Sequence, residues 1–143
     1  MAWLWCLAVL SSLPQTARAK PADYDIQIEM APAAIVGERQ TLSLEINPAP
    51  KRSISTDGPI KVSLSVAPAT GLTVEKTILR RADAIAKEAE ATAGVHFAVG
   101  FIATKPGRYQ LDFDIRFWLC GRRTCRPVRE HRQVEIVIAL RGL

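Results

Sequence analysis

The sequence predicts an all-β fold, an antiparallel β-sandwich of about seven strands, and three observations support this prediction. Apolar and polar residues alternate along most of the chain, which is the period of half-buried strands. Turn-forming Pro, Gly, Asn and Asp residues separate these runs at short intervals. The 143 residues, 48% of them hydrophobic, are enough for one domain and exclude a disordered chain or a dense disulfide scaffold.

The first nineteen residues have the pattern of a secretory signal peptide. An apolar run over residues 2–10 is followed by Pro14 and by a small-x-small cleavage site ending at Ala19. This run is about half of the ~20 residues that a helix needs to cross a bilayer, so stable membrane insertion is not expected. We therefore expect cleavage of residues 1–19, a single domain over residues 20–143, and a periplasmic or secreted location.

Seven runs carry the strand pattern, and the weakest of them covers residues 73–79. The expected strands are residues 24–30, 42–46, 60–66, 73–79, 95–101, 109–119 and 134–140. Asp83 could cap a short helix over residues 83–91, but that stretch has little apolar face, so a loop is an equally supported alternative. Seven strands joined by short connections predict an immunoglobulin-like sandwich.

The segment Gly107-Arg108-Tyr109-Gln110-Leu111 supports this prediction. It resembles the Gly-x-Tyr-x-Cys entry to the sixth strand of immunoglobulin domains, where the Tyr anchors a corner. Leu111 stands where antibody domains place the inter-sheet cysteine, so the standard long-range disulfide is not expected. Cys120 and Cys125, the two cysteines left after cleavage, must have another role.

Cys120 and Cys125 flank a four-residue connection between the last two strands. Core-facing residues are odd-numbered up to Leu119 in the first strand and even-numbered from Val134 in the second. Both cysteines should therefore point away from the core. Opposed residues of a hairpin have Cα atoms about 4.5 to 5.5 Å apart, which permits a disulfide, and an oxidising compartment would let it persist.

Two interpretations of such a bond stay open. Closing a ring of about six residues stabilises a protein by only ~2 kcal/mol, and an accessible disulfide exchanges readily with thiols. Arg122, Arg123 and Arg126 would favour the thiolate form, and Trp118 could shield the sulfur atoms. The alternative is a non-enzymatic binding or structural module in which the bond only pins a hairpin and the arginines are solvated.

The pattern Cys-x4-Cys-x-Pro after a strand, formed by Cys120, Cys125 and Pro127, resembles the N-terminal periplasmic domain of the thiol:disulfide interchange protein DsbD family. The likeness extends to the layout of most of residues 20–143. It implies an immunoglobulin-like fold whose C-terminal hairpin carries a redox-active cysteine pair. By this resemblance, the pair would accept electrons from a membrane donor and pass them to periplasmic thiol–disulfide proteins. In that family a loop with an aromatic tip covers the cysteines, whereas residues 80–94 here contain no aromatic residue.

Other site types receive little support from the sequence. Cys120, Cys125 and His131 could bind Cu(I), but their spacing is not that of a zinc site, and we expect no metal and no cofactor. Asp112 and Asp114 share a strand face without any further feature of a hydrolase. The basic hairpin could attract nucleic acid, but an exported chain would not meet it, so no nucleic-acid partner is expected. The oligomeric state cannot be derived from the sequence.

Overall fold

The structure is a computed structural model that describes residues 22–30, 34–85 and 94–142. The expected signal peptide lies outside these residues. The elements in chain order are β1 (Tyr24–Met30), β2 (Ala34–Ile35), β3 (Arg39–Pro48), β4 (Ser53–Ile54), β5 (Lys61–Ala67), β6 (Leu72–Val74), β7 (Ile78–Arg80), the 3₁₀ turn η1 (Arg81–Asp83), β8 (Val95–Ala103), β9 (Gly107–Cys120) and β10 (Cys125–Ala139). No helix in the described part of the chain is long and apolar enough to cross a membrane.

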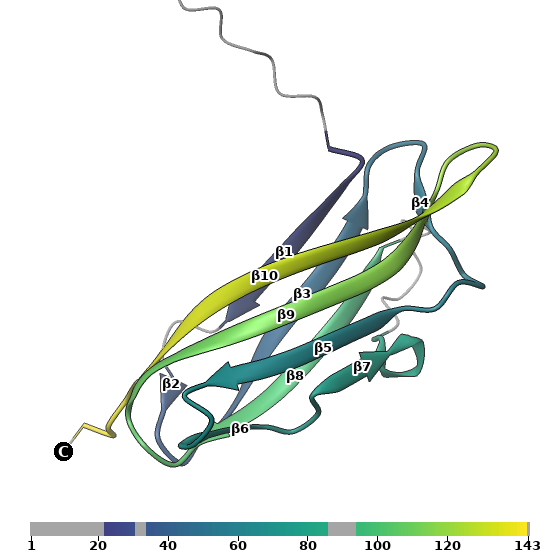
Figure 1. Ribbon diagram of the computed structural model, residues 1–143. Helices are drawn as coiled ribbons and strands as arrows, with labels where there is room; N and C mark the ends of the chain where they lie inside the picture. Colours follow the sequence, from purple (N-terminus) through teal and green to yellow (C-terminus); the bar gives the residue numbers. More distant parts are fainter. Residues whose placement is uncertain (1–21, 31–33, 86–93, 143) are drawn as a thin grey trace, which may run out of the picture.

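Two β-sheets form the layers of a sandwich (Figure 1). One sheet has the strand order β1-β3-β8-β6, and the other has the order β2-β10-β9-β5-β7, with β4 paired to the end of β9. These orders match the ABED and GFC sheets of immunoglobulin domains. The short strand β2 runs parallel to the last residues of β10. The predicted immunoglobulin-like sandwich is therefore confirmed.

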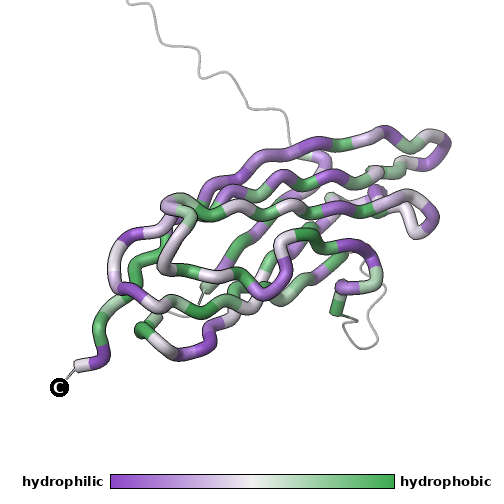
Figure 2. The backbone as a smooth tube through the Cα atoms, turned by 60° about the horizontal axis from the view of Figure 1, so that its bottom comes forward, coloured by the Kyte–Doolittle hydropathy of each residue, from purple (hydrophilic) through white to green (hydrophobic). Residues whose placement is uncertain are grey.

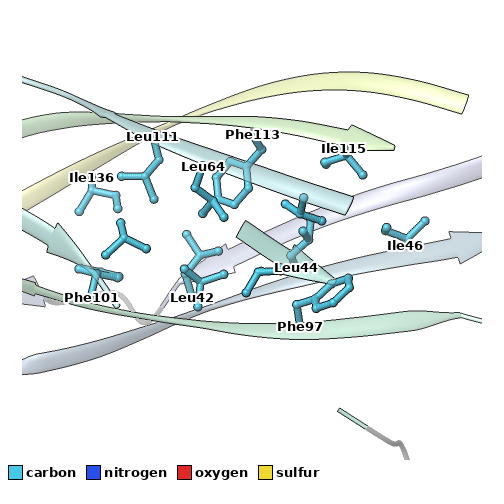
Figure 3. Packing of buried hydrophobic residues seen from close by; sticks show 14 of the residues in the cluster. Leu42, Leu44, Ile46, Leu64, Phe97, Phe101, Leu111, Phe113, Ile115 and Ile136 are labelled. Carbon is cyan, nitrogen blue, oxygen red and sulfur yellow. The ribbon is translucent and has the colours of Figure 1, made fainter. Parts of the chain in front are cut away.

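The hydrophobic core lies between the two sheets and consists of alternate residues from each strand. Leu44 and Phe97 from one sheet face Leu111 and Phe113 from the other, and all four are fully buried (Figure 3). Apolar and polar residues alternate along the strands, as Figure 2 shows by colour. Leu111 thus fills the position of the inter-sheet cysteine by packing alone.

The predicted tyrosine corner is present at the start of β9. The hydroxyl of the buried Tyr109 donates a hydrogen bond to the carbonyl oxygen of Lys105 over 2.8 Å. Gly71 has φ +98°, and a Cβ at this position would lie 2.4 Å from the Tyr109 hydroxyl oxygen. Only glycine therefore fits beneath the tyrosine.

The predicted strand over residues 73–79 was wrong, because this segment forms two strands in different sheets. β6 pairs with β8, whereas β7 pairs with β5. Val74 and Leu79 are both buried, yet they are an odd number of residues apart and would face opposite sides of one strand. The buried positions change from even-numbered to odd-numbered residues between Val74 and Leu79, where the chain crosses from one sheet to the other.

The predicted helix does not begin at Asp83. Asp83 instead ends the single 3₁₀ turn η1, and its carboxylate accepts a hydrogen bond from the backbone N–H of Arg80 over 2.8 Å. Ala84 is extended, and Ile85 forms an isolated bridge with His96. The remainder of the predicted helix, residues 86–91, lies outside the described residues.

The last strand begins at Cys125 rather than at residue 134. The sequence pattern missed this half of β10 because Val128 is the only apolar residue at its inward positions before Val134, and polar residues at other inward positions contact Asp23 and Tyr24. Arg126 Nη2 lies 3.2 Å from Asp23 Oδ2, and the Tyr24 hydroxyl donates a hydrogen bond to the Glu130 carboxylate. The apolar–polar alternation of a half-buried strand is lost where polar side chains occupy its inward positions.

Candidate functional site: the disulfide end of the β9–β10 hairpin

Cys120 and Cys125 form a disulfide at the outer end of the β9–β10 hairpin, with an S–S distance of 2.00 Å and a Cα–Cα distance of 4.0 Å. The two residues are directly opposed in a register that continues without interruption to Gly107 and Ile138. Leu119 is buried and Cys125 is exposed, so the predicted outward orientation of the cysteines is confirmed. The Cα atoms lie closer together than the 4.5 to 5.5 Å that we expected.

The hydrogen-bond pattern explains why the two cysteines can be joined at this position. The backbone N–H of Gly121 donates to the carbonyl oxygen of Thr124 over 2.9 Å and closes the turn. Hydrogen-bonded and non-hydrogen-bonded pairs alternate in an antiparallel ribbon, so Cys120 and Cys125 form a non-hydrogen-bonded pair, whose side chains are closest together. The bond thus reinforces a pairing that the ladder already makes and does not link the two sheets.

The two cysteines differ in their access to solvent. Cys120 is half-buried, because Ser53 of β4 pairs with it on the side opposite Cys125. Cys125 is exposed and, among the described residues, has no strand on its other side. An incoming group would therefore reach the disulfide most easily at Cys125.

Trp118 and Pro127 form the next pair along the outer face of the hairpin. Trp118 keeps 37% of its surface exposed, and its ring lies against Gly58, where a Cβ would be 3.0 Å from Trp118 Cδ1. Its predicted shielding of the sulfur atoms stays a prediction. Trp118 and Pro127 form a non-hydrogen-bonded pair, so the backbone nitrogen of Pro127 points away from β9, towards the free edge of β10. Because proline has no N–H, β10 cannot donate a hydrogen bond to another strand at this position.

The structure does not bring the three predicted tuning arginines to one side of the disulfide. Arg122 and Arg123 lie in the exposed turn and have no acidic partner among the described residues. Arg126 belongs to the inward-facing set and binds Asp23, whose other oxygen lies 3.6 Å from Arg52 Nε. The hydrogen bond from Arg126 is the main cause that holds the pKa of Asp23 below its usual value. Sequence reasoning missed Asp23 and Arg52 because both come from distant segments.

The other predicted candidates lie further along the same face. Asp114 accepts from Arg116 and Arg129, and the hydrogen bond from Arg129 is the main cause of its lowered pKa. A lowered pKa is the opposite of what a general acid requires. His131 lies six residues from Cys125, which is about 20 Å along the strand, and no group of three metal-ligating side chains occurs in the described residues. The Cu(I) interpretation therefore has no geometric support.

A groove of about 470 Å³ opens on the outer face next to the Trp118–Pro127 pair. Its lining combines apolar and cationic side chains and contains no carboxylate among the described residues. The lining residues are Pro59, Lys61, Arg80, Arg116, Phe117, Trp118, Pro127, Val128 and Arg129. The outer face of the hairpin next to the disulfide thus carries a groove that is lined by both basic and apolar residues.

No protein-family model matches the chain, and no curated protein matches it. Among solved structures it is similar to a cohesin module from a family 33 glycoside hydrolase of Clostridium perfringens, with a TM-score of 0.51 and 12% sequence identity over 85% of this chain and 100% of the module. It is also similar to AggA, the major subunit of aggregative adherence fimbriae type I from Escherichia coli, with a TM-score of 0.44 and 10% identity over 86% of this chain and 100% of AggA. The likeness to the cohesin module shows the fold alone.

Proposed function

We propose that this chain is an exported, non-enzymatic immunoglobulin-like module that binds a partner through the outer face of the β9–β10 hairpin. The observation that carries this proposal is the groove beside Trp118 and Pro127, because concave surfaces that combine an aromatic side chain with arginines are typical of binding sites. The Cys120–Cys125 bond rigidifies one end of this surface. Export is supported by the signal-peptide pattern of residues 1–19 and by the disulfide, which persists in oxidising compartments.

A redox titration of the Cys120–Cys125 pair tests this role of the bond. A structural bridge has a reduction potential below about −300 mV, and we expect this bond to fall in that range. Hydrogen exchange of the reduced protein should accelerate only in the turn and in the adjoining ends of β9 and β10. A clearly more oxidising potential would contradict the structural assignment.

Thiol–disulfide exchange is the second candidate, and the exposure of Cys125 favours it. In this reaction, a thiolate of a reduced donor dithiol attacks one sulfur, the S–S bond breaks, and the leaving sulfur takes up a proton. The donor's second thiol then resolves the mixed disulfide, so two electrons and two protons reach the Cys120–Cys125 pair while the donor becomes a disulfide. The reverse sequence passes them to an oxidised partner. By the DsbD resemblance, the donor would be a membrane protein and the acceptors periplasmic proteins.

The same titration distinguishes the candidates, and a kinetic assay sharpens the result. An electron carrier would have a potential well above that of structural bridges and would reduce a protein disulfide faster than glutathione does. Replacing both cysteines with serine would abolish this transfer. A module whose disulfide is structural would show neither property.

A further inference from the structure

Four cationic side chains form a row across the outer face of the six-stranded sheet. Neighbours in the row are directly opposed in the strand register: Arg80 of β7, Lys61 of β5, Arg116 of β9 and Arg129 of β10. Strands lie about 4.8 Å apart, so the row extends over about 14 Å. The four residues come from distant parts of the chain, and all of them line the groove.

This arrangement is electrostatically unfavourable for the isolated protein. Like charges directly opposed across strands repel each other and destabilise a sheet. Asp114 offsets part of the repulsion, because it lies 3.5 Å from both Arg116 and Arg129. Lys61, at the middle of the row, has no acidic partner among the described residues. The row therefore keeps an excess of positive charge that an anionic partner would neutralise.

Two apolar side chains lie directly beside the row. Trp118 and Pro127 are two residues from Arg116 and Arg129 along their strands, which is about 7 Å. The exposed part of Trp118 offers a flat surface on which an apolar side chain can pack. The groove thus presents extended positive charge and one apolar contact next to each other.

We propose that this groove docks an acidic peptide segment of a partner protein, with carboxylates along the cationic row and an apolar side chain on Trp118 and Pro127. A single small anion could reach only neighbouring members of a row that extends over about 14 Å, whereas a run of Asp or Glu residues spans it. The proposal rests on the proposed binding function and names the chemistry of its partner. Charge complementarity of this kind accelerates association and makes it dependent on salt.

The test uses the full chain with Trp3→Phe and Trp5→Phe, which leaves Trp118 as the only tryptophan. The probe is a blocked peptide of six glutamates with a leucine at each end, titrated while Trp118 emission is recorded. We expect saturable binding that weakens at least about tenfold between low and physiological salt. The double variant Lys61→Gln/Arg116→Gln should lose at least about tenfold in affinity.

The double variant Arg108→Gln/Arg141→Gln is the matched control, because it also removes two positive charges, and these arginines pair with Glu135 and Glu38 outside the groove. This variant should change the affinity less than about twofold. An equal loss in this control and in Lys61→Gln/Arg116→Gln would overturn the proposal, since it would show attraction by net charge alone. Binding of inorganic phosphate, a short oligonucleotide or phosphatidylserine vesicles as strong as that of the peptide would also overturn it.

The outcomes separate this proposal from the proposed function. If the redox titration shows that the Cys120–Cys125 pair exchanges with thiols and the peptide still binds, the docking proposal is supported and the structural role of the disulfide is contradicted. If the disulfide is structural and the peptide does not bind, only the docking proposal falls. Repeating the titration with Cys120→Ser/Cys125→Ser should leave some peptide binding, because the row itself contains no cysteine.

Discussion

At one end of the β9–β10 hairpin the core-facing side chains are buried on both strands, whereas at the other end those of β9 are buried and the first residues of β10 are exposed. Tyr109, Ile136 and Ile138 are buried at the first end, which β2 also covers. At the second end Leu119 of β9 is buried, whereas Cys125 and Arg126 of β10 are exposed and are held by the pairing with β9, the disulfide and the Arg126–Asp23 ion pair. Figure 1 shows this second end at the tip of the longest ribbon.

This difference indicates a division of roles along one pair of strands. Burial of apolar surface is the main source of stability, so the covered end anchors the ribbon in the core. The first residues of β10 at the tip contribute little burial, and they are held by the pairing with β9 and by local bonds. Its side chains can therefore serve recognition without loss of the fold. The following predictions test this division, beginning with the largest expected effect.

Leu111→Ala removes a fully buried side chain near the covered end. The free energy of unfolding should fall by about 3 kcal/mol, because a cavity replaces close packing, and urea denaturation would measure the change. Val137→Ala, at a position that is 54% exposed on the adjacent strand, is the control and should cost less than ~1 kcal/mol. Equal losses for the two variants would contradict the anchoring role of this end.

Cys120→Ser/Cys125→Ser breaks the covalent contact at the tip. Because the bond closes a ring of only about six residues, the loss in unfolding free energy should be about 2 kcal/mol. Hydrogen exchange should rise between residues 117 and 128 and stay unchanged around Tyr109 and Ile136. Faster exchange throughout the sandwich would show instead that the disulfide supports the whole fold.

Tyr109→Phe removes the hydrogen bond to the Lys105 carbonyl while it keeps the ring. We expect a loss of about 1 kcal/mol, typical of one hydrogen bond, measured by urea denaturation at neutral pH. A variant as stable as the natural chain would mean that packing on Gly71, rather than the hydrogen bond, holds the corner.

A pH-dependent effect should appear at alkaline pH, at the contact between β1 and the tip half of β10. Burial, together with the hydrogen bond to the Glu130 carboxylate, raises the pKa of Tyr24 to about 12. A folded pKa above the unfolded value of 10.0 stabilises the protein fully below the unfolded pKa, and this contribution is lost as the pH rises through the folded pKa. The free energy of unfolding should therefore decline between about pH 10 and pH 12.

Tyr24→Phe serves as the control for this pH effect, because it has no ionisable group at position 24. Its stability should decline less over the same interval, as measured by chemical denaturation at a series of pH values. Superimposable curves for the two proteins would rule out the contribution of Tyr24.

Local pattern predicted much of the fold and part of the site. The alternation that ends at Leu119 correctly placed Cys120 on the outer face, and the corner at Tyr109 was correctly predicted from five residues. The prediction failed where tertiary contacts interrupt the apolar–polar alternation of a strand. Apart from Val128, the first half of β10 is polar on its inward face, where it meets Asp23 and Tyr24, and residues 73–79 change sheets.

The sequence by itself determined which face of each strand enters the core, because that choice depends on a side-chain period of two residues. It also determined that the two cysteines can meet, since they flank a short turn. Only the tertiary structure decided that Arg80, Lys61, Arg116 and Arg129 stand in one row. Strand pairing joins segments that are far apart in the chain, and its register is set by packing of the whole sandwich.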